Sequence, residues 1–503
     1  MPLRSCVYFQ EGPGLRKWQF GDNGIPFLNI RTFNKGRIDK SKCQFVILEE
    51  FKGKYEHFLL DEGDIVVSSS GTIGKLAVIS KVDLPVMLNT SIIRFRSLWP
   101  DRLLQEYLKY YLQSESFFSQ ITSSVTGTAI SNYGPSHLKQ MWIVVPPLNE
   151  QRRIVAKLEK LLAKVDACKQ RLEKIPTILA RFRQSVLARA CSGRLTADWR
   201  EQNPALESVE DRLKGFQKAR LSLATNERDY QALFKKFNQL VVYDSKLPEG
   251  WIYLSAECLC DFITKGTTPK KSELLEKGDI PYLKVQHIVN NKINFWPLPC
   301  FVSCHTHEEF LKRSKVFPRD VLMNIVGPPL NKVAIVPDEF PEWNINQALA
   351  IFRPINGMTP ECLAVILSFE GTTEEVLRRT RGVVGQSNIS LGQCRNLKIP
   401  VPPLAEQQEI VRRVESLLQK GDRIEQGYQK AKAKIDQLEQ SILAKAFRGE
   451  LVPQDPNDEP ASVLLDRIRE ERAKEQKAKT AKKSAKKTAK TTGKRGRKKA
   501  KSE

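Results

Sequence analysis

Apolar residues recur at alternating steps of four and three in two stretches of the chain. The first series is Ile154, Leu158, Leu161, Val165, Cys168, Leu172, Ile175, Leu179, Phe182 and Val186. The second series is Ile410, Val414, Leu417, Gly421, Ile424, Tyr428, Ala431, Ile435, Leu438 and Ile442. This spacing is typical of the a and d positions of a heptad, so it predicts two long coiled-coil helices.

Proline and glycine bound both predicted helices. A Pro-Pro-Leu run precedes each series, and proline suits only the first turn of a helix. Gly193 and Gly449 supply the C-caps, so each helix is about 43 residues, or roughly 65 Å, long. Pro176 lies inside the first helix and predicts a kink near residue 172. Two such helices in one chain most simply pack on each other as an antiparallel pair.

The remaining stretches hold short β-branched runs interrupted by glycine, proline and asparagine, which predicts short strands joined by turns. The expected fold is α+β, with two mixed α/β domains separated by the two long helices. The boundaries are residues 1–146 for the first domain, 147–244 for a helical spacer, 245–402 for the second domain, 403–472 for a second helical spacer and 473–503 for a tail.

The chain contains an internal repeat. The segment from Ile143 to Leu195 aligns without a gap with Ile399 to Leu451, beginning with I-V-V-P-P-L-N-E-Q against I-P-V-P-P-L-A-E-Q. The domains match more weakly, for example G-D-I-V-V from Gly63 against R-D-V-L-M from Arg319. A repeat of this length predicts two halves related by a pseudo-two-fold axis. Side chains between the matched positions differ, as expected of two domains that share a scaffold and recognise different targets.

The net charge of +24 is unevenly distributed. Residues 474–503 hold 14 Lys and Arg against 2 Glu and no large apolar side chain, so we expect a disordered tail. The tail is either a solvated extension or an arm that attracts phosphates. The rest of the chain is still basic enough to favour a polyanionic partner.

With 41% hydrophobic and 27% charged residues, the composition is that of a soluble globular protein. The N-terminal residues lack the apolar segment of a secretory signal, and no run of about 18 apolar residues predicts a membrane span. The ten cysteines form no framework and are expected to be reduced.

The sequence lacks recognisable catalytic motifs. It holds no P-loop, no amino-methyltransferase tetrapeptide and no convincing nuclease cluster. The best metal candidate is C-F-V-S-C-H-T-H from Cys300 to His307, with Cys258, Cys260 and His287 upstream, and the alternative is ordinary thiols and surface histidines. We therefore expect no cofactor or metal in this chain.

Polar residues at matched loop positions favour DNA reading, because Asn, Gln, Arg and Lys can pair with base edges. Ordinary loop chemistry is the alternative at each single position. The candidates in the first domain are Asn29, Arg31, Lys35, Ser69, Thr72, Lys75, Asn89, Thr90, Ser131, Asn132 and Tyr133. Those in the second domain are Lys284, Gln286, Asn290, Asn324, Asn331, Lys332, Asn346, Gln347, Ser387 and Asn388.

The doubled I-x-V-P-P-L-x-E-Q segment and the closures L-A-x-A-x-x-G-x-L from Leu187 and Leu443 resemble the specificity subunit of Type I restriction–modification systems. Supporting motifs are T-A-D-W-R from Thr196, L-P-E-G-W from Leu247 and K-G-T-T-P from Lys265. The resemblance covers residues 1–472. The first domain departs from the pattern: if Val7 matches Phe262, its opening strand is missing, so either that domain is short or its true start lies upstream.

The resemblance implies a noncatalytic cytoplasmic subunit of a bacterial or archaeal complex. Each domain would read one half of a bipartite asymmetric DNA target, and the helices would dock two adenine methyltransferase subunits, through which restriction motor-nuclease subunits join. S-adenosylmethionine, ATP and Mg²⁺ would then bind to those partner subunits. The alternatives are a specificity chain of a nuclease-free methylation or other phage-defence system, or a structural coiled-coil scaffold.

Overall fold

The computed structural model describes the chain except for Lys35 and residues 124–131, 205–207, 240–246, 328–329, 381–387 and 475–503. The chain forms two compact units. Unit 1 comprises Met1–Leu172 and the chain from Lys430 onward, and unit 2 comprises Glu173–Gln429. The predicted disordered tail lies almost wholly outside the described residues.

The first domain is built on a four-stranded antiparallel sheet in the order β1-β9-β7-β8. All four residues of β7 are buried, which explains why it reads as a continuous apolar run. The strands of unit 1 are β1 (Val7–Glu11), β2 (Phe20–Gly21), β3 (Ile25–Phe27), β4 (Phe33–Asn34), β5 (Arg37–Ile38), β6 (Gln44–Val46), β7 (Ile65–Ser68), β8 (Leu76–Val78) and β9 (Ile92–Ser97). Its short helices are α1 (Leu48–Phe51), α2 (Gln105–Tyr111), α3 (Glu115–Ser123) and α4 (Pro135–Leu138).

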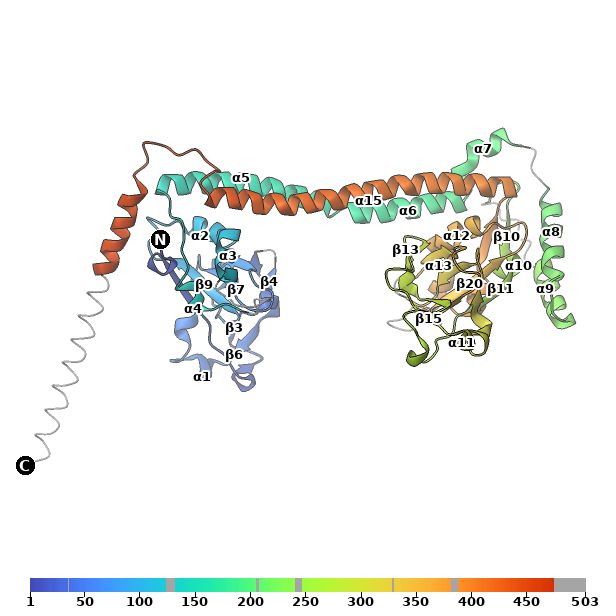
Figure 1. Ribbon diagram of the computed structural model, residues 1–503, viewed down its shortest axis with the longest axis horizontal. Helices are drawn as coiled ribbons and strands as arrows, with labels where there is room; N and C mark the ends of the chain where they lie inside the picture. Colours follow the sequence, from blue (N-terminus) through green and yellow to red (C-terminus); the bar gives the residue numbers. More distant parts are fainter. Residues whose placement is uncertain are drawn as a thin grey trace, which may run out of the picture. The chain divides into compact units, whose positions relative to one another are not determined.

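The second domain repeats this sheet in the order β11-β20-β17-β18. Figure 1 labels β11 and β20 of this sheet. A second sheet has the order β15-β12-β19-β16, and β10 pairs with β21. The strands are β10 (Ile252–Ser255), β11 (Cys260–Lys265), β12 (Ile280–Leu283), β13 (Ile288–Val289), β14 (Lys292–Ile293), β15 (Phe301–Val302), β16 (Lys315–Val316), β17 (Val321–Asn324), β18 (Val333–Ile335), β19 (Trp343–Ile345), β20 (Leu349–Pro354) and β21 (Lys398–Val401). The short helices are α10 (Ala256–Leu259), α11 (Cys304–Glu308), α12 (Pro360–Ser368), α13 (Glu370–Thr380) and α14 (Leu391–Arg395).

Strand register corrects the predicted match between the two domains. Tyr8 lies opposite Arg96, and Phe262 lies opposite Arg353. Tyr8 and not Val7 therefore corresponds to Phe262. The one-residue difference coincides with a register shift between Cys260 and Phe262, which no pattern of apolar residues reveals.

The pairing of the first residues with the segment before α5 differs from its counterpart in unit 2. In unit 2, β10 pairs with β21 over four residues. In unit 1, a single bridge joins Pro2 to Trp142, and the Met1 amino group donates to the Ile143 carbonyl. The pairing in unit 1 is therefore an isolated bridge with flanking hydrogen bonds.

The long helices begin directly after the paired prolines, as predicted. They are α5 (Leu148–Leu172), α6 (Ile175–Cys191) and α15 (Leu404–Phe447). The predicted break is present: α5 ends at Leu172 and α6 restarts with Pro176 in its first turn. A proline there removes a backbone donor and clashes with the preceding turn.

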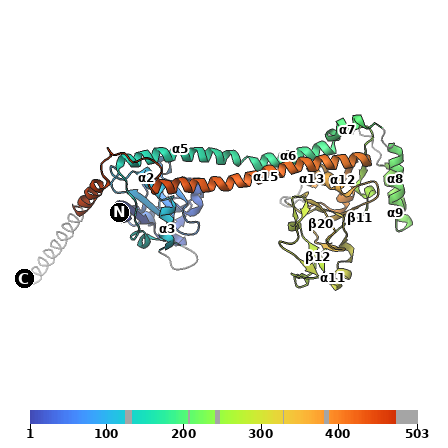
Figure 2. The same ribbon diagram turned by 45° about the horizontal axis from the view of Figure 1, so that its top comes forward.

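The helices pack antiparallel within each unit (Figure 2). In unit 1, Lys169 of α5 lies 3.6 Å from Asp436 and also pairs with Glu439. In unit 2, Arg183 of α6 pairs with Asp422 of α15 at 2.9 Å. Val186, which follows Arg183 in α6, shares an apolar cluster with Ile410, which precedes Asp422 in α15.

The predicted heptad series is only partly buried. Ile410 and Val414 are almost fully buried, whereas Ile424 is 55% and Leu438 is 50% exposed. Cys168 is also exposed. The coiled-coil pair is present, but a pair of helices covers an apolar side chain on one side only, so positions such as Ile424 and Leu438 stay half exposed.

Other helices complete each core. α7 (Ala197–Gln202), α8 (Val209–Leu221) and α9 (Glu227–Gln239) follow α6. Phe216 and Phe237 join the core of the second domain. The helix at 461–474 adds Leu464 and Ile468 to the core of unit 1. No helix among the described residues is long and apolar enough to span a membrane.

Candidate nucleic-acid interface

The glutamine of each P-P-L-x-E-Q motif connects a helix to its domain. Gln151 is fully buried, donates to the Arg102 and Pro146 carbonyls and accepts from the Leu104 amide. Gln407 repeats this in unit 2 with the Gly357 and Pro402 carbonyls and the Thr359 amide. A buried amide with its donors and acceptor paired defines one arrangement of helix and domain.

The glutamate of the motif has partners in only one copy. Fully buried Glu406 accepts from Trp251 Nε1 at 2.7 Å and Thr196 Oγ1 at 2.6 Å, and it pairs with Arg200. The T-A-D-W-R and L-P-E-G-W motifs thus meet at one carboxylate. Among the residues that the structure describes, no hydrogen bond or ion pair reaches the Glu150 side chain. Burial raises the pKa of Glu150.

A glycine at the end of the first sheet strand allows close packing in each domain. A Cβ atom on Gly12 would lie 2.5 Å from the Asn89 backbone. A Cβ atom on Gly266 would lie 2.2 Å from the Asn346 carbonyl oxygen. Such contacts are not tolerated, so the glycine of K-G-T-T-P serves to hold two loops together.

The loops that carry the candidates of the first domain meet at one end of the sheet. Ser70 bridges Asn132, and the Ser69 amide donates to the Ser91 carbonyl at 2.8 Å. The Cβ position of Gly71 lies 3.2 Å from the Ile30 side chain. The sequence did not predict that these loops contact one another; the folding of the sheet places them side by side.

The second domain brings the corresponding loops together. Val326 bridges Asn388, the Asn346 amide donates to the Leu283 carbonyl at 3.0 Å, and the Ile325 amide donates to the Ala348 carbonyl at 2.9 Å. Both domains therefore present one composite loop surface each, and we define these as the reading ends.

Exposure divides the candidate residues. The exposed ones are Arg31, Thr72, Lys75, Thr90, Asn132, Gln286, Asn290, Gln347 and Asn388. The partly exposed ones are Asn29, Asn89, Lys284, Asn331, Lys332 and Asn346. The buried ones are Ser69, Tyr133 and Asn324. Lys35, Ser131 and Ser387 lie outside the described residues.

Several candidates hold the loops in place. Asn29 Oδ1 accepts from the Arg31 amide at 2.9 Å, and Asn89 Oδ1 accepts from the Ser91 amide at 2.8 Å. Asn331, with φ of 59°, exchanges hydrogen bonds with Thr373. These are turn roles for which asparagine is suited. Asn346 Oδ1 and the Tyr133 hydroxyl are buried with no described hydrogen-bond partner.

Two equivalent hairpins add residues that sequence comparison missed. β4–β5 carries exposed Arg37, and β13–β14 carries exposed Lys292 beside Asn291, whose φ is 58°. Two- and three-residue strands give too short a pattern to detect. The asparagine pair at 290–291, which follows Ile288 and Val289, was the available sequence indication.

An equivalent ion pair lies at the other end of each sheet. Arg96 Nε lies 2.7 Å from fully buried Asp64, and Arg353 Nε lies 2.8 Å from Asp320, which is 2% exposed. The repeated aspartate before β7 and β17 is explained by this pair. It supports the sheet away from the reading end.

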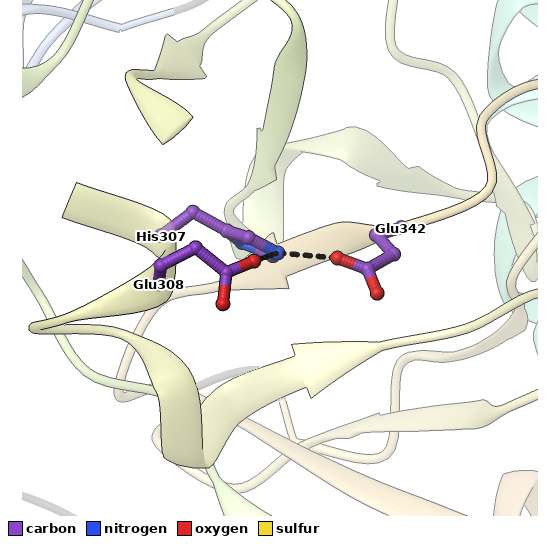
Figure 3. A group of neighbouring side chains, drawn as sticks. All are labelled: His307, Glu308 and Glu342. Carbon is purple, nitrogen blue, oxygen red and sulfur yellow. Dashed lines mark hydrogen bonds and ion pairs between the residues drawn. The ribbon is translucent and has the colours of Figure 1, made fainter. Parts of the chain in front are cut away.

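The metal candidates of the sequence do not meet. Cys258 and Cys260 are buried in the domain core, while Cys304 is exposed. Within the described ranges, the one cluster with metal-ligand geometry is His307, Glu308 and Glu342 (Figure 3).

Hydrogen bonding in this cluster opposes metal binding. Asn344 Oδ1 accepts from the Ile345 amide at 3.2 Å, so Asn344 Nδ2 donates to His307 Nδ1 at 2.8 Å. His307 Nε2 then carries the proton and donates to Glu342 at 2.7 Å. Lys315 lies 2.6 Å from Glu308 and 3.4 Å from Glu342. The cluster is satisfied internally and supports the second sheet.

Comparison with known protein sequences gives one family. Residues 9–177 and 248–434 match the family described as "Type I restriction modification DNA specificity domain". The chain is 28% identical to the Type I restriction enzyme EcoBI specificity subunit of Escherichia coli, covering 94% of this chain and 91% of that protein. It is 29% identical to the EcoKI specificity subunit of Escherichia coli strain K12, covering 90% and 89%.

A solved structure supports the fold. A chain from a structure of complex assembly and conformational transition in the type I R-M system matches with a TM-score of 0.61 and 20% identity, covering 85% of this chain and 92% of that one. The family match spans most of both domains, all of α5 and most of α15. The chain therefore belongs to the Type I restriction–modification DNA specificity family and is a specificity subunit with two target recognition domains.

Proposed function

We propose that each reading end contacts one half of a bipartite asymmetric DNA target. The observation that carries this proposal is the duplicated sheet, which presents two equivalent loop surfaces with different exposed side chains. Arg31, Lys75 and Thr90 stand in the first, and Gln286, Gln347 and Asn388 in the second. Amide and guanidinium groups of these kinds pair with base edges in the major groove.

The domain boundaries are part of this proposal. Residues 1–146 and 245–402 act as the recognition domains, 147–244 and 403–472 as helical spacers, and 473–503 as a basic tail that adds phosphate attraction. The buried and capping candidates, such as Ser69 and Asn29, shape the loops, and the exposed candidates contact bases.

The chain itself acts without catalysis in this proposal. It assembles in the cytoplasm with two adenine methyltransferase subunits along its long helices, and restriction motor-nuclease subunits join through them. S-adenosylmethionine, ATP and Mg²⁺ then bind to those partners. The chain selects the DNA sequence and orients the partner subunits on it.

The test is to reconstitute the chain with its methyltransferase subunit and map methylated adenines on a random-sequence DNA library. We expect one motif with two half-sites separated by a fixed gap. Gln347→Ala should relax the half read by the second domain by about 1–3 kcal/mol and leave the other half unchanged. A single ungapped motif, or relaxation of both halves, would contradict the proposal.

A further inference from the structure

An open hollow lies between α6, α7 and α15 in unit 2. Its volume is about 380 Å³, and it is lined by Arg189, Arg194, Leu195, Asp198, Arg412, Arg413, Ser416 and Leu417. Half of the lining residues are arginines, which sets this hollow apart from an ordinary polar surface depression.

The arginines outnumber the carboxylates beside them. Asp198 lies 2.6 Å from Arg413, and Glu409 lies 2.7 Å from Arg412 and 2.5 Å from Arg413. Hydrogen bonds from Arg412 and then Arg413 lower the pKa of Glu409 to about 2. A hydrogen bond from Arg413 likewise lowers the pKa of Asp198. Both carboxylates are thus ionised at neutral pH and are paired with two of the four guanidinium groups.

The other two guanidinium groups are available. Arg189 and Arg194 are exposed, and within the described part of the chain neither has an ion pair. The hollow therefore keeps a surplus of two positive charges. Guanidinium groups bind carboxylates and phosphates through paired hydrogen bonds, so the hollow fits an anionic group.

The hollow opens away from the second domain. Gln407 faces the domain, since it donates to the Gly357 carbonyl at 2.8 Å. At about 100° per helical residue, Arg412 and Ser416 lie about 140° and 180° around α15 from Gln407. Side chains in these positions point to the far side of the helix.

The reading end lies at the opposite end of the domain from α15. β20 starts beside the loop at 346–348 and ends at Pro354, just before the Gly357 contact with Gln407. Six strand residues span about 20 Å. A duplex held by the loops lies beyond the reach of the hollow, which favours a protein partner over DNA.

The hollow occurs in one half of the repeat. The aligned positions of Arg189, Arg194, Arg412 and Arg413 in the other copy are Lys445, Glu450, Ala156 and Lys157. None of these four positions in unit 1 therefore carries a guanidinium group. Two otherwise equivalent helical surfaces differ in this feature, so partners on the two halves are held differently.

We infer that this arginine hollow anchors an acidic segment of the protein subunit that docks on the helices of unit 2. The inference rests on the proposed assembly with methyltransferase subunits. Carboxylates of that segment bind Arg189 and Arg194, while Arg412 and Arg413 are held in place by Glu409 and Asp198.

The test measures binding of the purified methyltransferase subunit to the full chain by titration calorimetry at several salt concentrations. We expect R189S/R194S to weaken binding at the affected half by at least about 10-fold and to reduce the salt dependence. R189K/R194K keeps the charge and should lie between the variant and wild type. The matched control K157S/K160S removes two exposed lysines from the equivalent surface of unit 1 and should change binding less.

Each result decides the matter. Equal binding by R189S/R194S and wild type would overturn the role of the hollow and leave the proposed function intact. Absence of binding by the wild-type chain would overturn both. If R189S/R194S instead weakens binding of a random-sequence duplex in an anisotropy titration, with methyltransferase binding unchanged, the hollow contacts nucleic acid and the inference is wrong. Thermal unfolding should be unchanged in all variants, because the altered side chains are exposed.

Discussion

Replacing Glu406 with glutamine should destabilise unit 2, whereas the same change at the equivalent Glu150 should not destabilise unit 1. Both oxygens of Glu406 face donors: Trp251 Nε1 on one side, Thr196 Oγ1 and Arg200 on the other. A glutamine must turn its NH₂ group toward one of these sides. Glu406→Gln therefore places two donors against each other in a buried site.

The magnitude follows from the burial of the site. Losing a charge-assisted hydrogen bond costs about 1.5–3 kcal/mol, and leaving a buried donor unpaired costs about 1–3 kcal/mol. The Arg200 side chain is 17% exposed and also donates to the Gly193 carbonyl at 2.8 Å, so it keeps some compensation. We expect a loss of about 3 kcal/mol in the free energy of unfolding of unit 2.

Glu150→Gln is the matched control. Its carboxylate is desolvated without a described partner, because the nearby Arg153 pairs with Asp458 at 2.6 Å. Burial raises the pKa of Glu150, so the ionised form is disfavoured in the folded state. Glu150→Gln should be neutral or slightly stabilising at neutral pH. This advantage should fade as the pH falls through the raised pKa and vanish below the unfolded value of about 4.3.

The assay combines urea unfolding with hydrogen exchange read by mass spectrometry. Two units need not unfold together, so exchange must assign the change to peptides of one unit. Glu406→Gln should speed exchange around 251–255 and 404–414, and leave peptides around 148–158 protected. If Glu406→Gln and Glu150→Gln change the free energy of unfolding by the same amount, the number of hydrogen-bond partners does not decide the effect and the prediction is refuted.

Three further expectations concern the loops, tail and helices. Gly266→Ala should weaken binding to one half-site and lower stability, because its Cβ atom would meet the Asn346 carbonyl at 2.2 Å; unchanged thermal unfolding would contradict this. Deleting residues 474–503 should weaken nonspecific DNA binding and its salt dependence without changing the methylated motif, as seen by methylation mapping. Inserting four residues after Leu172, at the break between α5 and α6, should lengthen this helical spacer by up to about 6 Å and change the gap between unchanged half-sites, or abolish binding; a second insertion at Tyr428 should restore pairing better than either alone. Methylation at the original spacing and rate would mean that the helices do not set the gap.

The sequence was sufficient to predict the long helices and the duplication. Heptad spacing and paired prolines located the starts of α5 and α15, and Pro176 located the break after Leu172. These features arise from neighbours within one or two helical turns, where spacing and backbone chemistry decide the structure. The repeat was equally visible, because it needs only comparison of the chain with itself.

Only the tertiary structure decided which polar residues hold the fold and which face solvent. Ser69, Tyr133 and Asn324 have residue types suited to DNA reading but are buried inside the folded domains. Glu406 meets partners from positions more than 150 residues away, and Glu150 does not, although both stand in the same motif. Burial and pairing depend on contacts between distant segments, and a motif specifies only its own side chains. The sequence therefore determined the long helices and the internal duplication. The packing of the domains determined the role of each polar residue.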